Sequence, residues 1–108
     1  MTKLSIIVPV YNMDGYLDRC LGSIVRQTFT DFEFIIICDN PNNKEGISLL
    51  YEYAKQDNRI KLLLNEENIG LTKSLNRGLA IAKGQYIARM DADDISLPDR
   101  FEEQLSLL

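Results

Sequence analysis

The sequence predicts an α/β fold in which a mostly parallel, Rossmann-like sheet is flanked by helices. Short apolar runs alternate with amphipathic stretches along the whole 108-residue chain. Regular alternation of this kind is typical of parallel strands joined by right-handed helical crossovers, with both faces of the sheet covered. No internal repeat, low-complexity tract or linker interrupts the chain, so we expect residues 1–108 to belong to one domain.

The first strand is predicted over residues 4–9, an apolar, β-branched run that ends at a proline. The next segment, roughly residues 13–28, has the apolar stripe of an amphipathic helix. That stripe consists of Leu17, Cys20, Leu21, Ile24 and Val25. A second strand is predicted over residues 32–37, and the turn-forming residues 39–43 stop it.

The middle of the chain predicts a helix, a strand and a further helix. The second helix is marked by Ile47, Leu50, Tyr51 and Ala54. Residues 60–64 are predicted as the third strand, and the loop 65–70 leads into the third helix. We expect one face of that helix to carry Leu71, Leu75, Leu79 and Ala82. Lys83 and Gly84 are expected to end it, as a basic last turn followed by a C-terminal glycine.

The last strand is predicted over residues 85–90, and it leads directly into an acidic segment, residues 91–94. Pro98 is expected to open a final helix, because proline is favoured at the first helical position. One face of this helix would carry Phe101, Leu105 and Leu108.

Composition excludes several classes of function. The chain has 12 basic and 16 acidic residues, a net charge of −4, and no basic run, so we do not expect nucleic-acid binding. It has no histidine, which excludes a Cys/His zinc site and an imidazole base. Cys20 and Cys38 lie in apolar runs and are predicted to be buried free thiols.

No segment of the sequence is as long and apolar as a membrane span, and residues 1–3 lead straight into a strand rather than forming a signal peptide. We therefore expect a cytoplasmic location. In a full-length protein, residues beyond this chain could still hold it at the inner face of the membrane.

Polar and turn-forming residues collect where the predicted strands end. They are Tyr11 with Asn12, Asp39 with Asn40, residues 65–70 and residues 91–94. In parallel α/β sheets, ligands bind outside the carboxyl ends of the strands. This edge of the sheet is therefore predicted to hold the functional site.

Asp91 and Asp93 are the candidates for a divalent-cation site. Two carboxylates at positions i and i+2, leaving a strand, are hard oxygen ligands that suit Mn²⁺ or Mg²⁺, and such ions bridge phosphate oxygens. The same residues also fit a solvated turn in which Asp94 or Ser96 caps the final helix. The sequence has no GxGxxG after the first strand and no P-loop, which disfavours two other phosphate-binding folds.

Three further features of this edge each allow two interpretations. Tyr11 could pack against a base, or it could cover the sheet edge. Asp39 could accept a hydrogen bond from a uracil N–H, or it could begin a local Asx-turn. Residues 68–70 could bring the backbone close to a ligand, or they could simply lead from a loop into a helix.

Four separated motifs, taken in order, resemble family 2 glycosyltransferases of the GT-A fold. They are residues 7–12 (IVPVYN), Asp39-Asn40, Asn68-Ile69-Gly70 with Asn76 and Gly78, and residues 88–94 (ARMDADD). Lys83-Gly84 and Pro98-Asp99-Arg100 also look like that family. The resemblance spans essentially the whole chain. It implies the nucleotide-sugar-binding half of an inverting transferase.

The resemblance implies roles for the matching positions. Pro9, Tyr11 and Asn12 would line the nucleotide pocket, with Tyr11 near the base, and Asp39 would bind the uracil ring. The positions beside the base and diphosphate would be Asn68, Gly70 and Lys73. The metal-binding segment would be Asp91, Ala92 and Asp93, with Asp91 near the ribose and diphosphate and Asp93 on the Mn²⁺ or Mg²⁺.

Two positions depart from the family pattern. Where relatives often have Asp-Asp-Gly-Ser after the second strand, this chain has Cys38-Asp39-Asn40-Pro41, which keeps the aspartate but changes the loop. Many relatives carry an arginine at the position of Leu75. The family's general base is an acidic residue well downstream, and no residue here matches it. We therefore assign no catalytic residue to this chain and expect it not to transfer sugar alone.

The expected partners are a nucleotide-diphosphate sugar, UDP-linked by the resemblance, and a glycan, lipid-linked or protein acceptor bound by a region beyond this chain. A sheet edge and apolar surface left exposed by truncation would favour a homodimer. A sugar-1-phosphate nucleotidyltransferase would need a glycine-rich, basic loop after the first strand. A signalling module of the response-regulator type would need acidic residues where Asn12 and Asn65 stand. A non-catalytic α/β module remains the other alternative.

Overall fold

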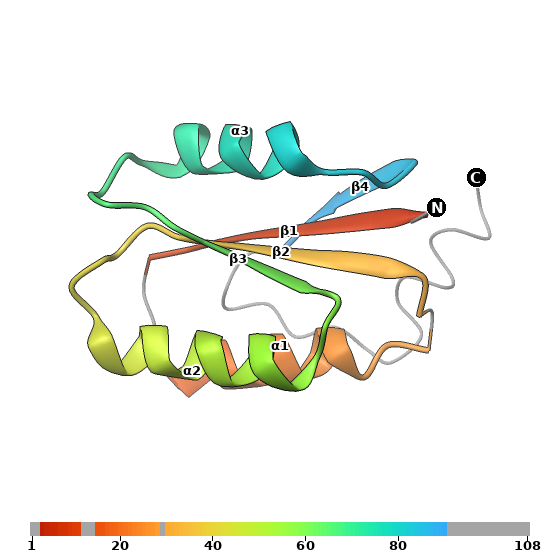
Figure 1. Cartoon of the computed structure of the whole chain (residues 1–108), viewed down its shortest axis with the longest axis horizontal. Coiled ribbons are helices and arrows are strands. Elements are labelled where there is room, and N and C mark those ends of the chain that lie inside the picture. Colours follow the sequence, from red (N-terminus) through yellow and green to blue (C-terminus); the bar gives the residue numbers. More distant parts are fainter. Residues whose placement is uncertain (1–2, 12–14, 29, 91–108) are drawn as a thin grey trace.

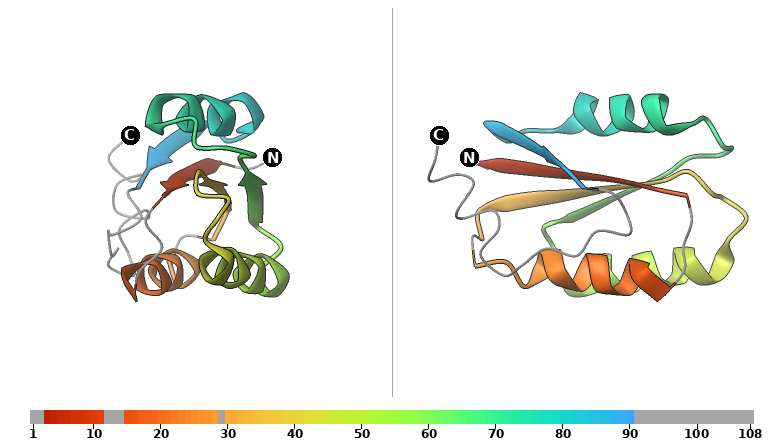
Figure 2. Two further views of the ribbon diagram at one scale, coloured as in Figure 1. Left: turned by 90° about the vertical axis from the view of Figure 1, so that its left-hand side faces the viewer. Right: turned by 180° about the vertical axis from the view of Figure 1, so that it is seen from behind.

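The structure is a computed structural model that describes residues 3–11, 15–28 and 30–90. Its elements are β1 (Leu4–Val10), α1 (Gly15–Val25), β2 (Phe32–Cys38), α2 (Lys44–Gln56), β3 (Ile60–Leu64), α3 (Leu71–Ile81) and β4 (Tyr86–Arg89). The four strands form one all-parallel sheet in the order β3-β2-β1-β4. Helices α1 and α2 cover one face and α3 covers the other (Figures 1 and 2). The predicted fold class is confirmed.

Both central strands are buried on both faces, which explains their continuous apolar sequences. Alternate residues of β1 point to opposite faces. Those beginning with Leu4 pack against α1 and α2, and Ile7 packs towards α3. Of the predicted stripe of α1, four residues are buried as expected, and Val25 is partly buried. Both cysteines are buried and free, as predicted. The helix expected after Pro98 lies outside the described residues.

Helix α3 is rotated relative to the sequence prediction. Leu71 and Leu79, expected on its buried face, are 51% and 49% exposed, while Ser74 and Gly78 are buried. A Cβ on Gly78 would stand 2.9 Å from side-chain atoms of Ile7 and Ile37, so the helix backbone approaches the sheet closely there. Small residues allow this close approach, and Leu71 and Leu79 consequently lie on the exposed side of the helix. In α2, Tyr51 is likewise exposed and not part of the buried face.

The glycine after α3 has a different purpose from the one predicted. The helix already ends at Ile81, and Ala82, its C-cap, has an extended backbone. Among the described glycines only Gly70 has a positive φ, so Gly84 is not a left-handed helix cap. Instead, a Cβ on Gly84 would lie 2.5 Å from the backbone nitrogen of Ser5. Gly84 is therefore required by close backbone packing of the α3–β4 connection against β1.

A buried carboxylate secures this connection. Glu33 Oε2 accepts hydrogen bonds from Ser5 Oγ at 2.6 Å and from the Lys83 backbone N–H at 2.5 Å, and Ser5 Oγ also accepts from the Gly84 N–H at 2.8 Å. Glu33 Oε1 pairs with Lys61 Nζ at 2.6 Å. Burial raises the pKa of Glu33, but the hydrogen bonds and the lysine more than reverse this, so its pKa lies below its ordinary value.

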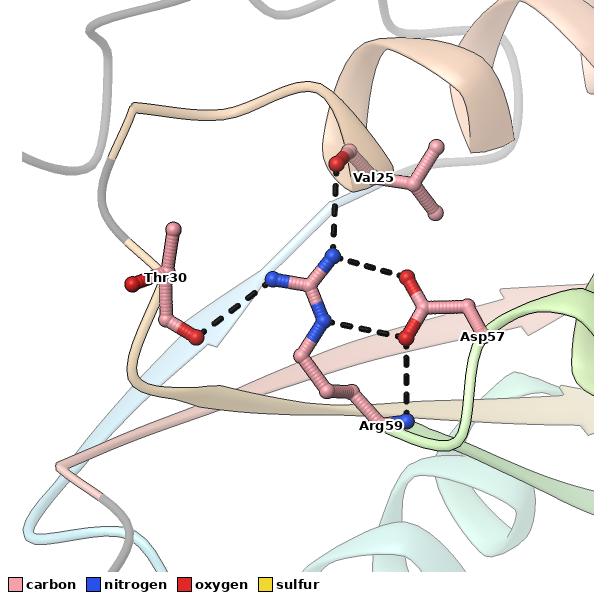
Figure 3. A network of polar contacts seen from close by, with 4 residues as sticks. All are labelled: Val25, Thr30, Asp57 and Arg59. Atoms are coloured by element: carbon pink, nitrogen blue, oxygen red, sulfur yellow. Dashed lines mark hydrogen bonds and ion pairs between the residues drawn. The ribbon is translucent and has the colours of Figure 1, made fainter.

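Arg59 holds the amino edge of the sheet together (Figure 3). Its guanidinium pairs with Asp57 through Nη2 at 2.7 Å and Nε at 3.0 Å. It also donates to the backbone oxygens of Val25, at 3.3 Å, and Thr30, at 3.4 Å. The guanidinium carbon lies 4.1 Å from the centroid of the Phe32 ring, within the range of a cation–π contact. This network joins the end of α1 and the starts of β2 and β3.

Candidate functional site

Three loops meet at the carboxyl edge of the sheet, at the left in Figure 1. Strands β1, β2 and β3 end level with one another, because Val10 pairs with Cys38 and Cys38 pairs with Leu64. Strand β4 lies on the other side of β1, so the strand order reverses between β1 and β4. A reversal of this kind is where open α/β sheets bind ligands.

A pocket of about 210 Å³ opens at this edge. Its lining consists of Pro9, Val10, Tyr11, Asp39, Asn68, Gly70, Leu71 and Ser74. Five of these are residues that the sequence analysis selected, namely Pro9, Tyr11, Asp39, Asn68 and Gly70. The selected Lys73 is exposed on α3 and is not part of the lining. Asn12, Asp91, Ala92 and Asp93 lie outside the described residues.

Asp39 is the polar centre of the pocket. It directly follows β2, is only 5% exposed, and accepts hydrogen bonds on both carboxylate oxygens. Oδ1 accepts from Asn65 Nδ2 and from the Ile69 N–H, each at 2.8 Å, and Oδ2 accepts from the Gly70 N–H at 2.9 Å. The local Asx-turn considered for Asp39 is therefore wrong, because its partners come from the β3–α3 loop. The Asx-turn belongs to Asn40, whose Oδ1 accepts from the Asn42 N–H.

Asp39 is ionised in this setting. Burial raises its pKa, but hydrogen bonds from the Ile69 N–H, the Asn65 amide, the Gly70 N–H and the Ser74 hydroxyl more than reverse that rise. The pKa of Asp39 is therefore below its ordinary value. A buried carboxylate that stays negative at neutral pH can accept a hydrogen bond from a ligand but cannot donate one.

The conformation of the β3–α3 loop depends on Gly70. This residue has φ 91° and ψ 168°, a region that is essentially restricted to glycine. The conformation directs the Gly70 N–H at Asp39 while the Gly70 carbonyl accepts the Ser74 N–H and starts α3. Residues 68–70 are thus more than a passage from loop to helix, because their backbone organises the carboxylate.

Arg77 was not singled out from the sequence, and Asn65 was named only as part of the loop 65–70 and given no binding role. Asn65 is 3% exposed, and its Nδ2 also donates to Ser74 Oγ at 3.1 Å. Its Oδ1 accepts from Arg77 Nη1. The sequence carries no signal for this network, because the burial of Ser74 follows from the rotation of α3.

Tyr11 follows β1 and is 50% exposed beside the pocket, so its ring is available to a ligand. Its backbone oxygen accepts from Asn40 Nδ2 at 3.3 Å, which links the loops after β1 and β2. On the other side of β1, the Met90 N–H donates to the Ile7 carbonyl at 3.1 Å, so the chain still runs alongside β1 at residue 90. The predicted metal ligands follow immediately in the sequence.

Within the described ranges, no three acidic or cysteine side chains come together as a metal site. The same ranges contain no helix long and apolar enough to cross a membrane.

A parallel sheet with this strand order and a pocket at the carboxyl ends of β1 and β2 defines a Rossmann-like α/β domain. The particular family follows from a match of residues 5–108 to the family model described as glycosyl transferase family 2. The chain belongs to that family.

Similar proteins agree with this assignment. An uncharacterized glycosyltransferase of Methanocaldococcus jannaschii is 44% identical over 106 residues, which cover 97% of this chain and 37% of that protein. The crystal structure of Staphylococcus aureus TarS 1–349 in complex with UDP-GlcNAc superposes with a TM-score of 0.87 at 26% identity, over 97% of this chain and 30% of that one. GalNAc-T7 with UDP, GalNAc and Mn²⁺ superposes with a TM-score of 0.74 at 28% identity, over 83% of this chain and 17% of that one.

These structural neighbours are glycosyltransferases of the GT-A type, so the fold implied by the sequence motifs is confirmed. The chain spans less than half the length of the curated relatives that it matches.

Proposed function

We propose that this chain is the donor-binding half of an inverting glycosyltransferase and that it binds a UDP-sugar complexed with Mn²⁺ or Mg²⁺. The observation that carries the proposal is the pocket at the carboxyl ends of β1 and β2, where the buried, ionised Asp39 and the exposed ring of Tyr11 lie together. A carboxylate that only accepts suits the ring N–H of uracil, which lies between two carbonyl groups. The tyrosine ring offers a surface on which a base can stack.

The structural neighbours support a UDP-linked donor. TarS 1–349 has been crystallised with UDP-GlcNAc and GalNAc-T7 with UDP, GalNAc and Mn²⁺. By analogy we assign a hexosyl or N-acetylhexosaminyl donor to the full-length protein. Asp91 and Asp93, a pair of hard oxygen ligands, fit Mn²⁺ or Mg²⁺, and they follow β4 on the side of β1 where the strand order reverses. When bound, the cation would offset negative charge on the departing diphosphate.

In this proposal the residues of the chain bind and orient the donor. Asp39 and Tyr11 fix the base, and Asp91 and Asp93 would hold the diphosphate through the cation. An acceptor hydroxyl attacks the anomeric carbon from the face opposite the diphosphate. The bond from that carbon to the diphosphate oxygen breaks as the new glycosidic bond forms, and the configuration inverts. A base outside this chain takes the hydroxyl proton, so the chain alone binds donor without transferring sugar.

Calorimetric titration with UDP, with and without Mn²⁺, tests the proposal. We expect Mn²⁺ to tighten UDP binding by at least about tenfold, which is the scale of one strong charge interaction. Asp93→Ala should abolish this tightening. The matched control is Asp31→Ala, which removes an exposed aspartate at the amino edge and should leave it intact. Absence of UDP binding by the unaltered chain would indicate a non-binding module instead.

A further inference from the structure

The side chain of Asn65 can have only one orientation in this network. An amide has an accepting end and a donating end, and their placement follows from the partners. The Arg77 guanidinium can only donate, and the ionised Asp39 carboxylate can only accept. Asn65 Oδ1 must therefore face Arg77, and Nδ2 must face Asp39, as is found. A flipped amide would place oxygen against carboxylate and NH₂ against guanidinium.

Four donors hold the Asp39 carboxylate. Oδ1 accepts from Asn65 Nδ2 and from the Ile69 N–H, and Oδ2 accepts from the Gly70 N–H. The Ser74 hydroxyl is a further donor to this carboxylate. Asn65 Nδ2 also donates to Ser74 Oγ, so Asn65 fixes the position of Asp39 both directly and through Ser74.

Arg77 lies outside the ligand pocket. Its neighbours are those of an adjacent hollow of about 330 Å³, lined by Leu64, Asn65, Glu66, Glu67, Ile69 and Arg77. It also donates to the Leu64 carbonyl at 3.5 Å. Any influence of Arg77 on a ligand beside Asp39 must therefore pass through Asn65 and the end of β3.

We propose that Arg77 and Asn65 are positioning residues for base recognition: Arg77 orients the Asn65 amide, and Asn65 holds the Asp39 carboxylate in place to accept a hydrogen bond from the base. The inference rests on the proposed function, since it assumes that Asp39 receives a ring N–H of the nucleotide. It assigns to an arginine outside the pocket an effect on which base is accepted.

The test compares two ligands in Mn²⁺, UDP and UDP methylated at uracil N3, which lacks the ring N–H. In the unaltered chain we expect UDP to bind at least about tenfold more tightly than the methylated analogue, because a hydrogen bond to a charged group is lost. Arg77→Met keeps the apolar stem and should reduce this ratio by at least about threefold. Arg77→Lys, which keeps a donor, should restore part of it.

A control and a second variant make the result decisive. Arg59→Met removes a comparable arginine at the amino edge and should lower the melting temperature without changing the ratio. Asn65→Asp keeps the contact with Arg77 but presents an acceptor to Asp39, so it should reduce the ratio even if Arg77→Met does not fold. An unchanged ratio in Asn65→Asp, or in folded Arg77→Met, would overturn this inference alone. Failure of the unaltered chain to bind UDP would overturn the proposed function as well.

Discussion

A buried carboxylate lies at each end of strand β2, and the two differ in the groups that bind them and in their access to a ligand. Glu33 lies near the start of the strand and is 4% exposed, and Asp39 directly follows its end and is 5% exposed. Burial raises the pKa of each, and hydrogen bonds from nearby donors bring each pKa below its ordinary value. By burial and by direction of pKa shift, the two groups cannot be told apart.

Their surroundings separate them. The Glu33 carboxylate forms an ion pair with the Lys61 ammonium and accepts a hydrogen bond from the Lys83 N–H. The backbone around Gly84 packs tightly beside it. Asp39 is held by the Asn65 amide, the Ser74 hydroxyl and two backbone N–H groups, and it lines an open pocket. Perturbed carboxylates occur in structural networks as well as in functional sites. Here the open pocket is what marks Asp39 as the functional one.

Glu33→Ala should give the largest effect on stability. It would leave Ser5 Oγ–H and the Lys83 N–H without their acceptor inside the protein. We expect a loss of about 3 kcal/mol in the free energy of unfolding, at the low end for a broken buried pair because Lys61 is partly exposed. Urea unfolding followed by circular dichroism measures it. UDP affinity of the folded protein should be unchanged, and a tenfold loss would show that the two edges are coupled.

Gly70→Ala should have the next largest effect, and it acts at the other edge. An added Cβ meets nothing within 4 Å, so the cost comes from the positive φ alone, about 2 kcal/mol. Relief of that strain would move the Gly70 N–H away from Asp39, so UDP affinity should fall together with stability. Gly22→Ala is the matched control, because the atoms nearest to its added Cβ belong to the flexible Arg26 side chain. It should leave UDP affinity unchanged.

The strands and the position of the site could be predicted from the sequence. The apolar runs around Ile6, Ile36 and Leu62 are long enough to define strands, and the parallel arrangement then places Tyr11 and Asp39 at one edge. That Asp39 accepts from the β3–α3 loop could not be predicted. A short polar side chain after a strand fits a local turn equally well, and its partners Asn65 and Ile69 are about thirty residues away.

The rotation of α3 could not be predicted either. Leucine spacing favours a face centred on Leu75 that includes Leu71 and Leu79. The structure instead buries Ser74 and Gly78, because close approach to Ile7 and Ile37 requires small residues. The positions of Ser74 and Arg77 follow from this rotation, so their contacts with Asn65 could not be predicted from the sequence either. Gly84 was misread for a related reason, because its contact is with β1, at the other end of the chain.

Asp39→Asn tests whether Asp39 is the carboxylate that binds the ligand. An amide offers one accepting oxygen, so its NH₂ group must face either Gly70 or the pair Asn65 and Ile69, all of which donate. We expect UDP affinity to fall by about tenfold, corresponding to one lost hydrogen bond to a charged group. Calorimetric titration measures the change. Glu33→Gln is the same chemical change at the opposite end of β2 and should leave UDP affinity within a factor of about two.

Acidification should have the smallest effect on the free energy of unfolding, and the pH dependence should distinguish the two carboxylates. The pKa of each is lower in the folded chain than its ordinary value, 4.5 for Glu33 and 3.8 for Asp39. Each therefore contributes stability that is complete above the ordinary value and is lost as the pH falls through the lowered value. Urea unfolding at a series of pH values should show that Glu33→Gln flattens the decline that begins below pH 4.5. Asp39→Asn should flatten only the part that begins below pH 3.8.

UDP should steepen only the part of the decline that begins below pH 3.8, because UDP binds the ionised form of Asp39. If UDP steepened the decline equally in Asp39→Asn, the base would be held by another group.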